Sequence, residues 1–239
     1  MTVKPPPTPA EPPFSVRRPF LLLEEEGTVT KLTMVRHAQQ DYPSGDGFDF
    51  EEWEDPPLSG LGRTQAMALA AELGEQDVDA VYCSTMRRAV ETAQIVASPH
   101  GITPVIRENL VELQSYSKLE KGQDPMALVD PDEWATREEM FFKQVKWDYM
   151  FFGEGSEPFR RRAVAAVTAV VEENAGKHVV LVSHGGVINA YLADILGIEE
   201  DMFFLPNHCS ITSVWVKGDV RRVHSVNERM HLHAGLHTN

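Results

Sequence analysis

Cysteine is nearly absent from this sequence, which has only Cys83 and Cys209 among its 239 residues. Two cysteines do not make the disulfide framework of a small secreted domain, so a reducing, cytoplasmic location is expected. Long apolar runs are missing too, since no stretch approaches the roughly 20 residues that a membrane-spanning helix needs. Residues 20–27, FLLLEEEG, have three leucines followed by three glutamates, a pattern that is not typical of a signal peptide.

Basic residues are scarce relative to acidic ones. The chain has 22 lysines and arginines against 36 aspartates and glutamates, which gives a formal net charge of −14. This balance argues against binding to nucleic acid and to anionic membrane surfaces. An apolar fraction of 42% is typical of a globular protein, and the length allows one large domain or two small ones.

Proline is concentrated at the start of the chain. Residues 4–19, KPPPTPAEPPFSVRRP, cannot hold a helix or a strand ladder. We therefore interpret residues 1–27 as a flexible arm, with packing of that arm on a partner subunit as the alternative. Residues 28–230 are expected to form the folded domain. Residues 231–239 are expected to be a loosely held C-terminal tail.

Between these ends, strand and helix patterns alternate. Strands are predicted at 30–37, 79–84, 103–108 and 178–184, helices at 56–76, 85–101, 156–176 and 185–197, and a closing hairpin at 211–227. This alternation predicts an α/β fold, a three-layer α/β/α sandwich with a mostly parallel central sheet. A cap segment is expected at about 115–155, with a helix near 131–146. Its aromatic stretch, 134–152, predicts either a small core under the cap or an apolar wall for a ligand.

Two predicted strands end in residues that can bind an anion. Arg36 and His37 follow one strand, and His184 follows another and precedes Gly185, at the start of a helix. Ligands of open α/β sheets bind at the carboxyl ends of the strands, and a helix start offers free amides and a positive dipole end. The sequence therefore predicts one anion pocket that holds two histidines, Arg36 and the backbone at Gly185.

Two further segments supply charged groups to this pocket. Arg87 and Arg88 lie in the first turn of a helix that follows a strand, where basic residues oppose the helix dipole. Contact with an anion would explain one of them. Glu108 and Glu112 follow the next strand and can reach the same rim. Residues 48–55, FDFEEWED, are either a solvated loop or a rim that disfavours polyanionic substrates.

Two imidazoles, two guanidiniums and a carboxylate suit the transfer of a phosphoryl group. Arginine binds the nonbridging oxygens in bidentate fashion. One neutral imidazole can attack phosphorus, and the other can donate hydrogen bonds as charge spreads over the oxygens. The carboxylate can protonate the leaving oxygen and then activate water. This set needs neither a metal ion nor a cofactor, and none is expected.

Five motifs occur in order along the chain: VRHAQQ (35–40), PLSGLGRTQA (57–66), STMRRAVETA (84–93), LVE (110–112) and LVSHGGVI (181–188). Together they resemble the histidine phosphatase superfamily, the phosphoglycerate mutase-like enzymes, over about residues 30–230. The resemblance implies that fold and a role for each matching residue. It makes His37 the nucleophile and His184 the second histidine, Arg36 and Arg88 the phosphate-binding arginines, and Glu112 the proton donor, with Glu108 as the alternative.

The stretch between Glu112 and His184 is shorter than is usual for mutases of this family. In this respect the chain resembles the phosphatase branch. We therefore expect a metal-independent phosphomonoester hydrolase that acts through a phosphohistidine on a small phosphorylated metabolite. A phosphoglycerate mutase-type phosphotransferase and a phosphate-binding protein with little turnover remain the alternatives. The expected partner is the phosphate ester itself, with neither nucleic acid nor membrane, and a homodimer is left open.

Overall fold

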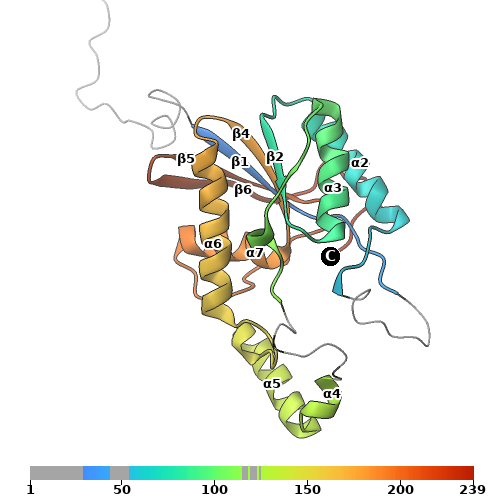
Figure 1. Ribbon diagram of the computed structural model, residues 1–239, viewed down its shortest axis with the longest axis vertical. Helices are drawn as coiled ribbons and strands as arrows, with labels where there is room; N and C mark the ends of the chain where they lie inside the picture. Colours follow the sequence, from blue (N-terminus) through green and yellow to red (C-terminus); the bar gives the residue numbers. More distant parts are fainter. Residues whose placement is uncertain (1–28, 44–53, 115–117, 119–122, 124) are drawn as a thin grey trace, which may run out of the picture.

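The computed structural model describes residues 29–43, 54–114, 118, 123 and 125–239. Within them, one sheet of six strands has the order β3-β2-β4-β1-β5-β6 (Figure 1). The strands are β1 (Thr30–Arg36), β2 (Ala80–Cys83), β3 (Val105–Ile106), β4 (His178–Ser183), β5 (Ile211–Lys217) and β6 (Val220–Glu228). The first four strands in that order are parallel, and β5 and β6 run antiparallel. The predicted mostly parallel sheet is confirmed, and its closing hairpin forms one edge.

Helices cover both faces of the sheet. The main ones are α2 (Gly60–Gly74), α3 (Arg87–Ala97), α6 (Ser156–Glu173) and α7 (Gly185–Leu196). Alternate side chains of β1 serve different layers, as expected for a strand buried on both faces. Leu32 and Met34 pack in the core with α6 and α7, whereas Val35 packs in the core with α2 and α3. The predicted three-layer sandwich follows from this alternation.

The start of α2 shows how local sequence positions the loop after β1. Ser59 caps this helix, because its side chain accepts a hydrogen bond of 2.9 Å from the amide of Gly62. A Cβ atom at Gly62 would lie only 2.0 Å from the carbonyl oxygen of Gln39. Glycine therefore lets α2 pass directly against the chain that leaves β1, close to His37.

The cap is formed by α4 (Pro125–Leu128) and α5 (Pro131–Gln144), which lie at the lower end of the molecule in Figure 1. Buried Asp201 ties the end of the cap to the main domain. One of its oxygens accepts a 2.8 Å hydrogen bond from the amide of Trp147, and the other is 3.5 Å from Arg160 on α6. The Trp147 ring is buried edge-on against Phe159 of α6, 4.6 Å between centroids.

The N-terminal arm and the C-terminal tail were both expected to be loosely held. The predicted N-terminal arm, residues 1–27, lies outside the described residues. The last residues are not loosely held, contrary to our expectation, because they are hydrogen-bonded to the main domain. The side-chain amide of Gln65 donates 2.7 Å hydrogen bonds to the carbonyl oxygen of Leu236 and to Oγ1 of Thr238. Among the described helices, none combines the length and apolar character needed to cross a membrane.

Candidate active site

The site lies where the two central parallel strands end. β1 and β4 are paired in register, so that Arg36 lies opposite Ser183, and the amide of His37 donates a 2.9 Å hydrogen bond to the carbonyl oxygen of Ser183. The next residue on the β4 side is His184. Its ring and that of His37 are tilted against each other, with 5.1 Å between centroids. The structure thus brings the two predicted histidines together.

The hydrogen bonds of His37 determine which of its ring nitrogens carries the lone pair. Its Nδ1 lies 2.8 Å from the carbonyl oxygen of Ala38, which can only accept, so Nδ1 carries the proton. Its Nε2 therefore presents a lone pair, which accepts a hydrogen bond of 3.3 Å from Nε of Arg88. Burial lowers the pKa of His37 well below its usual value, and the nearby His184 and Arg88 add to this. The imidazole is neutral near pH 7.

His184 is held from the other side of the site. Its Nε2 lies 2.7 Å from Oγ of Ser84, and that oxygen accepts a 3.3 Å hydrogen bond from the amide of Met86. The hydroxyl proton is then available for Nε2, an arrangement that favours a proton on Nδ1. Nδ1 is buried and has no hydrogen-bond partner among the residues described. Burial lowers the pKa of His184 well below its usual value, and Arg88 lowers it further.

Of the two arginines that begin α3, only Arg88 enters the site. Its side chain is buried, whereas Arg87 is exposed. Besides its contact with His37, Arg88 donates a 3.1 Å hydrogen bond to the carbonyl oxygen of Glu54 and lies 3.6 Å from the carboxylate of Asp55. Arg36 is anchored by a 2.5 Å hydrogen bond to the carbonyl oxygen of Pro206. The two guanidiniums approach from different elements.

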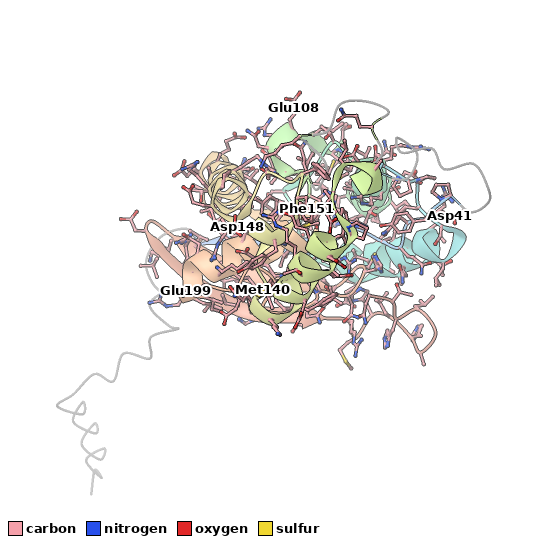
Figure 2. The ribbon with its side chains drawn as sticks, turned by 90° about the horizontal axis from the view of Figure 1, so that it is seen from below. Asp41, Glu108, Met140, Asp148, Phe151 and Glu199 are labelled. Carbon is pink, nitrogen blue, oxygen red and sulfur yellow. The ribbon has the colours of Figure 1, made fainter. Side chains whose placement is uncertain are left out.

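Glu112, rather than Glu108, lies at this site. The Glu112 carboxylate accepts hydrogen bonds of 3.1 Å from the amide of Gly186, in the first turn of α7, and of 2.9 Å from the amide of Leu113. Glu108 begins a short 3-10 turn and is exposed, at the outer edge of the molecule in Figure 2. Gly185, also predicted to contact phosphate, is the first residue of α7 and is buried beside Glu112.

Two of these groups, Arg88 and Glu112, line a cavity of about 380 Å³, together with Tyr42, Glu54 and Asp55. Of the acidic segment 48–55, the structure describes only Glu54 and Asp55, and both line this cavity. The cavity is therefore lined by one guanidinium and three carboxylates, and Asp55 lies 3.6 Å from Arg88. Such a cavity can hold an anion and a polar or cationic group attached to it.

A third histidine in the site was missed by the sequence analysis. His208 is buried, and its ring centroid lies 5.5 Å from that of His37. It precedes β5, which runs antiparallel to β1, so the start of β5 lies beside the end of β1. The amide of Cys209 accordingly donates a 2.9 Å hydrogen bond to the carbonyl oxygen of Arg36. The pairing of β5 with β1 places His208 here, and no local pattern in the sequence indicates that pairing.

The model of the histidine phosphatase superfamily (branch 1) matches residues 32–229. The chain belongs to this superfamily. It is 26% identical over 171 residues to the metal-independent phosphoserine phosphatase of Arabidopsis thaliana, covering 69% of this chain and 68% of that protein. Among solved structures, the mycobacterial glucosyl-3-phosphoglycerate phosphatase is 26% identical with a TM-score of 0.68, covering 84% of this chain and 100% of that one.

A phosphoglycerate mutase from Bacillus anthracis shares the fold, with a TM-score of 0.66 and 22% identity over 86% of this chain and 96% of its own. Phosphatases and a mutase of the superfamily therefore share the architecture described above. The fold alone does not separate these activities.

The contact between Glu112 and α7 can be tested at Gly186. A Cβ atom there would lie 2.3 Å from Oε1 of Glu112, so Gly186→Ala must displace the carboxylate. A misplacement of about 1 Å can cost on the order of 100-fold in rate, and we expect a loss of that size in hydrolysis of an alkyl phosphate. Gly60→Ala is the matched control, because nothing lies within 4 Å of its Cβ position. Equal activity of the two variants would contradict the role of this contact.

The buried histidines predict how stability depends on pH. In the fold, burial holds the pKa of His37 and His184 well below the usual 6.5, to which they return on unfolding. Below pH 6.5 the unfolded chain therefore binds protons that the folded chain does not, and the free energy of unfolding falls as the pH drops. Each histidine contributes a slope approaching about 1.4 kcal/mol per pH unit.

His184→Gln removes one of these groups. Urea unfolding at several pH values between 6.5 and 5 measures how the free energy of unfolding changes with pH. In His184→Gln this change should be smaller than in the original protein by about 1.4 kcal/mol per pH unit. His224→Gln, at an exposed position on β6, serves as the control and should leave the slope unchanged. An unchanged slope in His184→Gln would mean that His184 is not held neutral by the fold.

Proposed function

We propose that the protein is a metal-independent phosphomonoester hydrolase that acts through a phosphohistidine on a small phosphorylated metabolite. The observation that carries the proposal is the pairing of His37 with Arg88. Nε2 of His37 and the buried guanidinium of Arg88, which lines the cavity, lie 3.3 Å apart. A nucleophile beside a fixed cation is what attack on a phosphate dianion requires.

The first step forms the phosphohistidine. The phosphate binds with its oxygens on Arg36 and Arg88, and the Arg88 contact moves from Nε2 of His37 to a phosphate oxygen. Nε2 then attacks phosphorus while the bond from phosphorus to the leaving oxygen breaks. His184 donates from Nδ1 to a nonbridging oxygen as charge develops, and Glu112, which enters this step in its protonated form, gives its proton to the leaving oxygen.

The second step returns His37 to its starting state. The carboxylate of Glu112 takes a proton from water, and the oxygen of that water attacks phosphorus. The P–N bond breaks, the electron pair returns to Nε2, and inorganic phosphate leaves. The hydrogen bond from Nδ1 of His37 to Ala38 stabilises the positive charge that the ring carries while it is phosphorylated.

Relatives support hydrolysis and a small substrate. One is described as a metal-independent phosphoserine phosphatase and another as a glucosyl-3-phosphoglycerate phosphatase. A cavity of about 380 Å³ admits a leaving group of that size. The carboxylates of Glu54 and Asp55 in its lining disfavour further negative charge on the leaving group.

The proposal is tested by trapping the intermediate. Rapid acid-free quenching after mixing with a labelled aryl phosphate should give an acid-labile phosphoenzyme, and peptide mapping should locate the label on His37. His37→Ala should abolish both the label and the release of phosphate. A fully active His37→Ala protein would refute the mechanism. Transfer to 3-phosphoglycerate primed by its bisphosphate, without release of phosphate, would identify a mutase instead.

The two arginines of α3 offer a matched pair of variants. Arg88→Ala removes a buried donor from the reacting phosphate and should lower kcat/KM by roughly 100- to 1000-fold. Arg87→Ala changes an exposed side chain on the neighbouring position and should have little effect. Steady-state kinetics on p-nitrophenyl phosphate measures both effects. A larger loss of kcat/KM in Arg87→Ala than in Arg88→Ala would contradict the assignment of Arg88 to the phosphate.

A further inference from the structure

The third histidine has no task in the mechanism above. His208 is only 3% exposed, and its ring is tilted by 53° against that of the nucleophile. The next residue, Cys209, has φ 55°, a left-handed conformation that few non-glycine residues adopt. Such strained conformations cluster at functional sites. The backbone is thus held in an unfavourable geometry at the point where it presents His208 to the site.

The two ring nitrogens of His208 have different surroundings. Nδ1 lies 2.8 Å from Oγ1 of Thr238, near the end of the chain. Nε2 is buried and has no hydrogen-bond partner among the described residues. A buried polar nitrogen without a partner carries a free-energy cost, which an acceptor at that place would remove. Nε2 therefore marks a position for a ligand atom beside His37.

Gln65 indicates which nitrogen of His208 carries the proton. The amide of Gln39 donates a 2.9 Å hydrogen bond to Oε1 of Gln65, which identifies the oxygen of that side chain. Its Nε2 consequently donates to Oγ1 of Thr238, at 2.7 Å. Because this hydroxyl oxygen already accepts, its own proton can be donated to Nδ1 of His208. This chain of contacts favours a proton on the free Nε2.

His184, on the other side of His37, is held by a similar arrangement. The hydroxyl of Ser84 accepts from a backbone amide and faces Nε2 of His184, which leaves Nδ1 of that ring as the free donor. Both rings flank His37, at 5.1 and 5.5 Å between centroids. Burial and the charge of Arg36 together lower the pKa of His208 to about 3, against the opposing effect of a backbone hydrogen bond at Thr238, so the ring is neutral and has one proton to offer.

We propose that His208 is a phosphate-binding residue, whose Nε2–H donates a hydrogen bond to a nonbridging oxygen of the phosphoryl group held at His37. Gln65 and Thr238 are positioning residues that set this proton through Nδ1. The inference rests on the proposed function for its ligand, the phosphoryl group. It assigns a role in the site to the last residues of the sequence, which carry Thr238.

Two variants, His208→Gln and His208→Asn, separate phosphate binding through Nε2 from anchoring of Thr238 through Nδ1. The amide of Gln at position 208 can reach the place of Nε2, whereas that of Asn reaches only the place of Nδ1. Binding of inorganic phosphate, measured by calorimetry, should weaken roughly 10- to 100-fold in His208→Asn, since a hydrogen bond to a charged group is lost. His208→Gln should recover at least tenfold of that loss. His224→Asn, on the exposed side of β6, should bind phosphate normally.

The opposite ranking would show that His208 only anchors Thr238 and would overturn the proposal, as would equal affinities of both variants and the original protein. The tautomer gives a second test that needs no variant at position 208. Two-bond ¹H–¹⁵N spectra of the imidazoles should show the His208 proton on Nε2 in the original protein. In Thr238→Val the proton should move to Nδ1 and phosphate should bind more weakly. A proton on Nδ1 in the original protein would refute the proposed donor.

Failure of this inference and failure of the proposed function are distinguishable. If the original protein hydrolyses p-nitrophenyl phosphate while the His208 variants bind phosphate unchanged, only the role of His208 is refuted. If it binds phosphate through His208 without hydrolysing esters, the hydrolase proposal fails and the binding role stands. If it binds no phosphate at all, the role of His208 is refuted.

Discussion

The parallel pairing of β1 with β4 is the constraint on which the site depends. Arg36 and Ser183 lie opposite each other in this pairing, so both strands end at the same level. The residues that follow the two strands therefore meet. His37 and His184 are brought within 5.1 Å by this pairing rather than by any interaction of their own. Two neutral imidazoles attract each other weakly, and the strand ladder beneath them supplies the order.

Burial of so many polar groups at one point has consequences for charge. His37, His184 and His208 are all buried, and in each case burial is the main reason that the pKa is lowered. Neutral rings can be nucleophiles and donors close to the guanidiniums of Arg36 and Arg88 without adding to the positive charge. The site thus keeps its cationic charge on arginine, where it remains at any ordinary pH.

Glycine and the helix starts complete the arrangement. Gly186 has no side chain where the carboxylate of Glu112 approaches the first turn of α7, and Gly62 has none where α2 passes the loop after His37. The carboxylate therefore reaches a backbone amide at the positive end of a helix. Close backbone approach, rather than additional side chains, brings the acidic group to the candidate site.

Much of this was determined by the sequence. The alternation of strand and helix patterns predicted the layers, and the motifs around Arg36, Arg88 and His184 predicted residues that the fold brings together. These features are readable because they depend on local periodicity or on short motifs at strand ends. That only one of Arg87 and Arg88 would face the site was also predictable, since neighbouring helix positions point about 100° apart, and the resemblance pointed to Arg88.

Only the tertiary structure decided the remainder of the site. Glu108 and Glu112 are both acidic and lie four positions apart, and the short turn between them, not the sequence pattern, directs one outward and the other toward α7. His208 reaches His37 through an antiparallel pairing with β1, and Thr238 reaches His208 across 30 positions of chain. Contacts over such separations leave no periodic trace in the sequence, because their partners are set by how strands order in the sheet.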